Sequence, residues 1–201
     1  GGNHGLRCCR PDEGRRGVIG AVLIAAALTL PPAGSYTYSV SVNGTEMART
    51  AVTIEHRTDG TDFYEAATAN SQHIATHAHF DSSGAETAYN LAANGTAVLQ
   101  ATVTDGSVLM RTPAVHLAPI RGDVTQPIVV DAGLGGPIAM LPALIAATHA
   151  SALTIVMTRS PRAVHFTVAT QSNAARPSTV PASDAVLAIA AEGVTQTLWY
   201  D

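Results

Sequence analysis

The chain of 201 residues contains no lysine, and its only two cysteines, Cys8 and Cys9, are adjacent and lie near its start. No disulfide can therefore form within the part that follows them, which must be stabilised by its hydrophobic core. Counted from Ser35, seven arginines stand against thirteen Asp and Glu residues, which leaves a net charge near −6. An acidic surface repels a phosphate backbone, so nucleic acid is excluded as a partner.

Long apolar runs are scarce, and the clearest one spans residues 18–30, directly after Arg15-Arg16 and just before two prolines. A membrane-spanning helix needs about twenty apolar residues. A shorter run behind a positive charge is typical of a secretory signal. We therefore predict a signal peptide over residues 1–34 and an exported protein, periplasmic or secreted. Retention of the apolar run as an anchor is the alternative.

Residues 35–201 are the size of one domain, and we expect this β-rich domain to be truncated at its C-terminus because the sequence stops within a strand pattern. Dipeptides that end in glycine divide it into segments with alternating polar and apolar residues, as hairpin turns do. These turns are Asn43-Gly44, Asp59-Gly60, Ser83-Gly84, Asn94-Gly95 and Asp105-Gly106. The predicted strands are 36–42, 45–58, 61–70, 72–81, 85–93, 96–104, 107–112, 152–158, 163–170, 184–190 and 194–201.

The segment 127–150 departs from the two-residue period. Residues 128–131 have the pattern of a strand end, and glycines at 133, 135 and 136 predict a turn. Because proline is favoured in the first turn of a helix, Pro142 places a helix at about 141–149. The apolar stripe of this helix consists of Met140, Leu141, Leu144 and Ile145. The predicted fold is mainly β, a curved antiparallel meander forming one open half-barrel, with this short helix packed on its concave face.

This order of elements resembles the exported half-barrel proteins of the lipoprotein-carrier type and related uncharacterised periplasmic β-domains, and the terminal residues LWYD resemble a strand motif of the uncharacterised group. The resemblance implies an apolar cavity between the sheet and the helix. Met140, Leu141, Leu144 and Ile145 would then contact the ligand, an apolar small molecule or lipid. It also implies an envelope protein as a candidate partner, and it leaves the oligomeric state open.

Histidines cluster in the segment HIATHAHFD. On a strand, His73, His77 and His79 share one face, while Phe80 points to the other. Imidazoles two residues apart on a strand can both reach a zinc or copper ion. The alternative is that Phe80 occupies the core face and the histidines are ordinary polar residues on the solvated face.

Asp131 lies in the segment IVVDAG, which resembles the apolar-apolar-Asp-Thr/Ser-Gly signature of retropepsin-like aspartic proteases. Ala132 stands where that signature has a hydroxyl residue, and such proteases also need a second aspartate. Asp131 as the end of a strand is the alternative.

Three function classes follow from the sequence: a carrier of apolar ligands with no cofactor, a zinc or copper protein, and a degenerate aspartic hydrolase. We favour the carrier. We therefore expect a binding protein rather than an enzyme. The hydrolase is the enzymatic alternative.

Overall fold

A computed structural model describes residues 31–42, 45–69, 72–104, 106–117, 119–121, 127–131, 137–148, 150–169, 185–191 and 194–200, together with residues 176, 178 and 182. The predicted signal peptide lies outside these residues except for its last four positions. The first sheet consists of β1 (Gly34–Val42), β2 (Thr45–His56), β3 (Gly60–Ala69), β4 (Gln72–Asp81), β5 (Glu86–Ala93), β6 (Thr96–Thr104), β7 (Ser107–Arg111) and β8 (Ile120–Arg121). The second consists of β9 (Ile128–Val130), β10 (Ala152–Met157), β11 (Arg162–Ala169), β12 (Ala185–Ala191) and β13 (Val194–Tyr200).

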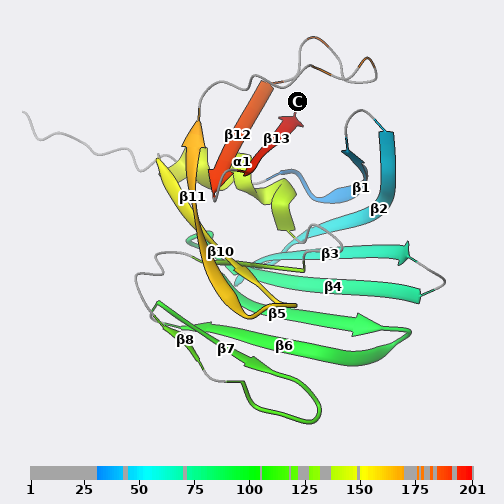
Figure 1. The fold of residues 1–201 in the computed structure, drawn as a ribbon, viewed down its shortest axis with the longest axis vertical. Helices are drawn as coiled ribbons and strands as arrows, with labels where there is room; N and C mark the ends of the chain where they lie inside the picture. Colours follow the sequence, from blue (N-terminus) through cyan, green and yellow to red (C-terminus); the bar gives the residue numbers. More distant parts are fainter. Residues whose placement is uncertain are drawn as a thin grey trace, which may run out of the picture.

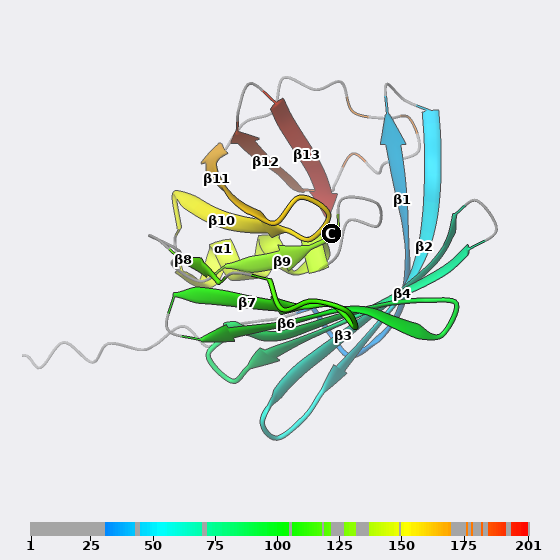
Figure 2. The same ribbon diagram turned by 60° about the horizontal axis from the view of Figure 1, so that its bottom comes forward.

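The first sheet is an antiparallel meander of eight strands in the order β1 to β8. It curves strongly, and the helix and the second sheet lie on its concave side (Figures 1 and 2). The mainly β class, the curved meander and the helix on its concave face are thus confirmed. The prediction of one sheet is wrong, because the strands from β9 onward pair among themselves.

The second sheet has the order β13-β12-β11-β10-β9. Its pairs are antiparallel except for β9 and β10, which run parallel, with Val129 opposite Val156. A parallel pair needs a long crossover, and the helical segment between the two strands provides it. This segment begins with a 3₁₀ turn, η1 (Pro137–Met140), and continues as the helix α1 (Leu141–Thr148). The helix predicted from Pro142 is therefore present.

Alternation along the strands determines which residues face the core. In β4, Ile74, Ala78 and Phe80 are buried, whereas His77 and His79 on the opposite face are partly exposed. Their projection opposite Phe80 was predicted from the two-residue period and is confirmed. One face of the first sheet is thus apolar and covered, and the other is polar and open, as expected for an antiparallel sheet with helices on one side.

Two local features shape the meander: a tight turn and a β-bulge. The Asn94-Gly95 turn has positive φ angles of 49° and 77°, the conformation that tight hairpins require. Between β4 and β5, a register shift falls between His79 and Phe80, so that Glu86 pairs with Phe80 while Ala88 pairs with His79. Such a bulge increases the twist and changes the direction of a side chain. Here the bulge places Glu86 opposite Phe80 and so determines the direction of the Glu86 side chain.

Candidate functional site

The predicted apolar stripe of the helix faces the core. Met140 and Leu141 are fully buried, and Leu144 and Ile145, one turn further on, are partly buried against the same core cluster. Burial thus decreases from the N-terminal to the C-terminal part of α1.

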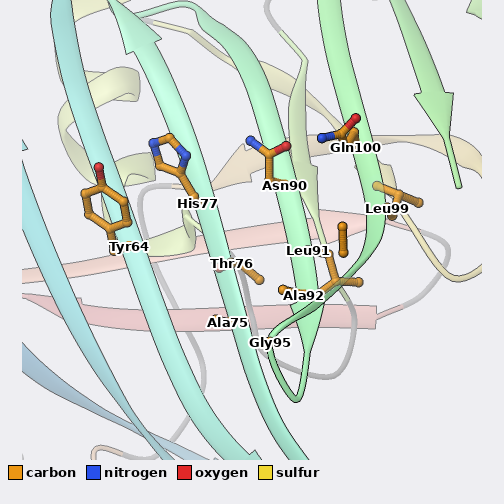
Figure 3. Close-up of a pocket in the computed structure, with 11 residues that line it drawn as sticks. Tyr64, Ala75, Thr76, His77, Asn90, Leu91, Ala92, Gly95, Leu99 and Gln100 are labelled. Atoms are coloured by element: carbon orange, nitrogen blue, oxygen red, sulfur yellow. The ribbon is translucent and has the colours of Figure 1, made fainter. Parts of the chain in front are cut away.

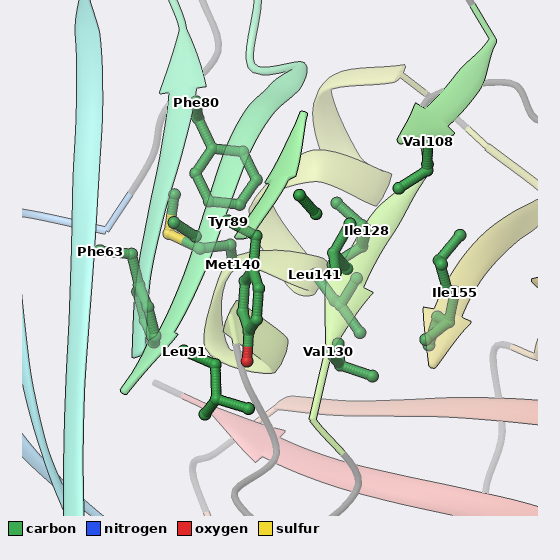
Figure 4. Close-up of a cluster of buried hydrophobic side chains, with 14 of the residues drawn as sticks. Phe63, Phe80, Tyr89, Leu91, Val108, Ile128, Val130, Met140, Leu141 and Ile155 are labelled. Atoms are coloured by element: carbon green, nitrogen blue, oxygen red, sulfur yellow. The ribbon is translucent and has the colours of Figure 1, made fainter. Parts of the chain in front are cut away.

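Around this stripe the two sheets contribute large apolar side chains (Figure 4). Phe63, Phe80 and Leu91 come from the first sheet, and Val130 comes from β9. The sheet and the helix therefore pack against each other through apolar side chains.

Within this core lies an acidic residue that the sequence did not single out. Glu86, at the start of β5, is 2% exposed, and its Oε2 accepts a hydrogen bond of 2.6 Å from the backbone N–H of Val129 in β9. The bulge explains its orientation, because residues opposite each other in an antiparallel pair share a face and Phe80 points inward. Burial raises the pKa of Glu86 well above its ordinary value, and the Val129 hydrogen bond opposes this only in part. Glu86 thus connects the two sheets, and burial favours the protonated form of its carboxyl group.

Tyr89 follows three residues later and is also buried completely. Burial raises the pKa of its hydroxyl, and the charges of Asp131, Glu86 and Glu65 raise it further. The hydroxyl therefore stays protonated and lies close to several acidic side chains.

Asp131 lies at the end of β9 and is 1% exposed. Its Oδ1 accepts hydrogen bonds from Arg159 Nε at 2.7 Å and Thr158 Oγ1 at 3.3 Å, and its Oδ2 accepts one from Arg159 Nη2 at 3.2 Å. The carboxylate is thus engaged by a bidentate arginine. This arrangement is typical of a structural ion pair, and Ala132, the neighbouring position of the protease-like signature, lies outside the described residues.

A second polar cluster lies on the outer face of the first sheet, centred on Asp62 in β3. Its Oδ1 accepts hydrogen bonds from His77 Nε2 at 2.8 Å and His79 Nδ1 at 2.9 Å, and its Oδ2 contacts Arg57 Nε. Tyr64 stacks on His77 with ring centroids 4.5 Å apart. The sequence pattern predicted the shared histidine face, but it gave no sign that Asp62 and Arg57 would join it.

This geometry bears on the predicted metal site. His73 does not join the other two histidines, because its Nδ1 shares a hydrogen bond of 3.1 Å with Thr68 Oγ1. Among the residues that the structure describes, no three His, Cys, Asp or Glu side chains are placed to hold a metal ion. The guanidinium of Arg57 also occupies one oxygen of the Asp62 carboxylate and takes the place that a cation would have there. Zinc or copper binding stays a prediction from the histidine spacing.

Next to the Asp62 cluster the outer face carries a groove of about 350 Å³. The side chains of Tyr64, His77, Asn90 and Gln100 stand in a row across four strands, on the face away from the second sheet (Figure 3). The groove opens to solvent and has polar side chains along one side.

The Asp62 cluster should make the free energy of unfolding depend on pH in the acid range. Burial pushes the pKa of Asp62 up, but the hydrogen bonds from His77 and His79 and the charges of His77 and Arg57 lower it below its ordinary value of 3.8. A lowered pKa in the folded state stabilises the fold above the unfolded-state pKa, and this contribution is lost as the pH falls through the folded-state pKa. We expect Asp62→Asn to cost about 2 kcal/mol at pH 7 and much less below pH 3.

Urea denaturation at a series of pH values measures this difference. Asp59→Asn, in the exposed turn before β3, is the matched control and should change stability little at any pH. An equal loss for Asp62→Asn at pH 7 and at pH 2.5 would show that the carboxylate charge does not stabilise the fold.

Comparison with known proteins gives no relative: no family model, no curated protein and no solved structure matches this chain. In the described part of the chain, no helix has both the length and the hydropathy needed to span a membrane.

Proposed function

We propose that the protein is an exported binding or carrier protein for an apolar or lipid-like ligand, held between the curved sheet and α1. The observation that carries this proposal is the graded burial of the helix on the concave face. Met140 and Leu141 fix its N-terminal end in the core, while Leu144 and Ile145 remain partly accessible. A ligand could enter where the helix is least buried.

Two physical arguments support this location. Apolar ligands bind in concave, mostly apolar sites with a few polar groups, and the space beside α1 offers apolar side chains from both sheets together with Glu86 and Tyr89. Methionine also adapts to ligands of irregular shape because it is unbranched and flexible, so Met140 suits such a site.

The proposal is tested by placing a charge on each side of α1. We expect Leu144→Asp to reduce uptake of a fluorescent fatty acid at least tenfold, because an aspartate on the core side would have to be desolvated next to the ligand. Ala146→Asp is the matched control, since Ala146 is exposed on the same helix and should leave uptake unchanged.

Circular dichroism must show that both variants keep the sheet. If the wild-type protein takes up no apolar probe, or if both variants bind it equally well, the ligand does not contact this side of the helix and the proposal fails.

Export rests on the Arg15-Arg16 pair and the apolar run behind it. A fusion of residues 1–34 to a reporter that is active only outside the cytoplasm tests it. Replacing both arginines by glutamate should abolish reporter activity, and equal activity of both fusions would contradict export by this segment. An envelope protein that delivers or receives the ligand is the partner that an exported carrier would need.

A further inference from the structure

Five buried side-chain polar atoms lack a hydrogen-bond partner among the described residues, and two of them, Glu86 Oε1 and Tyr89 Oη, belong to the same strand. Both residues come from β5 and are at most 2% exposed. A buried polar group without a partner costs about 1–3 kcal/mol, and native proteins contain few of them. Two such atoms in one strand therefore need an explanation.

Among the described residues, the Tyr89 hydroxyl has no hydrogen-bond partner. The backbone N–H of Asp131 lies near the phenolic oxygen, but the contact lacks hydrogen-bond geometry. A backbone N–H would in any case donate to the oxygen and leave the phenolic hydrogen unused. Figure 4 shows the Tyr89 ring extending between Leu91 and Val130, with its hydroxyl at the end remote from Phe80.

Glu86 is in the same situation. One carboxyl oxygen accepts the Val129 N–H, and the other has no partner among the described residues. Burial favours the protonated form of this carboxyl, and in that form its free oxygen carries a hydrogen that needs an acceptor. In this form both groups are uncharged donors.

We propose that Glu86 and Tyr89 form an internal polar site that binds the uncharged acceptor oxygen of an otherwise apolar ligand, such as the carbonyl oxygen of an ester or ketone. The inference rests on the carrier function proposed above and specifies its ligand class. An ammonium group would bring only further donors. A carbonyl oxygen supplies an acceptor without placing a charge in the core.

The experiment compares methyl laurate with n-tridecane, an alkane of similar length, as competitors of the dye N-phenyl-1-naphthylamine. We expect Tyr89→Phe to weaken the binding of methyl laurate about tenfold and to leave the binding of n-tridecane unchanged. The substitution removes one hydrogen-bond donor and keeps the ring. Glu86→Gln should retain ester binding, since an amide can accept from Val129 and still donate. Tyr64→Phe, which alters a tyrosine on the outer face, should affect neither competitor.

A second measurement separates ligand binding from a structural role. Without ligand, Tyr89→Phe should unfold at the same temperature as the wild type or higher, because the Tyr89 hydroxyl makes no hydrogen bond to any described residue. A lower unfolding temperature would show that the hydroxyl is already satisfied within the protein or by water, and would overturn the inference.

The outcomes for the two proposals differ. If neither the dye nor the competitors bind the wild-type protein, the carrier function fails and the inference fails with it. If both competitors bind, but Tyr89→Phe weakens the binding of both equally or of neither, the carrier function stands and only the internal polar site is refuted.

Discussion

Arg159→Met is expected to lower the free energy of unfolding by about 3 kcal/mol, because it leaves the buried Asp131 carboxylate without its cation. The guanidinium holds both carboxyl oxygens, through Nε at 2.7 Å and Nη2 at 3.2 Å. The remaining bond from Thr158, at 3.3 Å, cannot compensate a buried negative charge. Urea denaturation of the two proteins measures the loss.

The double variant Arg159→Met with Asp131→Asn is the control, since it removes the charge together with its partner. It should recover a large part of the stability, because replacing a whole buried ion pair costs less than breaking it. The side chain of Arg159 is 59% exposed, so water could screen the pair. A loss below 1 kcal/mol for Arg159→Met would show that water screening dominates.

Gly60→Ala is expected to cost about 3 kcal/mol, at the upper end of the range for overpacking. Gly60 starts β3 opposite Asp81 in β4, and a Cβ at this position would collide with the backbone carbonyl oxygen of Phe80. A backbone atom within a sheet cannot rotate away as the end of a side chain can. The collision would separate β3 from β4. These two strands carry the Asp62 cluster on one face and Phe80 on the other.

Gly95→Ala provides the comparison at another hairpin glycine. Its φ of +77° strains any other residue, but no atom lies within 4 Å of the added Cβ, so we expect a loss of only about 1 kcal/mol. Thermal denaturation followed by circular dichroism distinguishes the two. Equal losses at both positions would mean that β3 and β4 can shift enough to admit the methyl group.

Much of the fold follows from local sequence patterns. The Asn94-Gly95 turn, the alternation in β4 and the helix after Pro142 each depend on neighbouring residues, and each was predicted from them. The division into two sheets was not predictable in this way. It depends on where β9 finds its partner, and its parallel pairing with β10 is decided by tertiary packing, for which a three-residue strand carries no signal.

The candidate site was predictable only in part. The apolar stripe of α1 and the shared face of His77 and His79 follow from helical and strand periods. Asp62 joins those histidines only through the register of β3 with β4, which no residue near it specifies. Glu86 was missed because a charged residue at a strand start normally lies in water, and a one-residue bulge turns it inward.

Every paired strand of both sheets neighbours its partner in chain order. Each strand therefore pairs with the strand that precedes or follows it in the chain, and pairing between neighbouring segments is the kind that correlates with fast folding. A chain emerging N-terminus first, from a ribosome or a translocation pore, can pair each new strand with the one just before it. The step with the longest loop to close is the pairing of β9 with β10 across α1, and we expect it to limit the rate at which the second sheet forms.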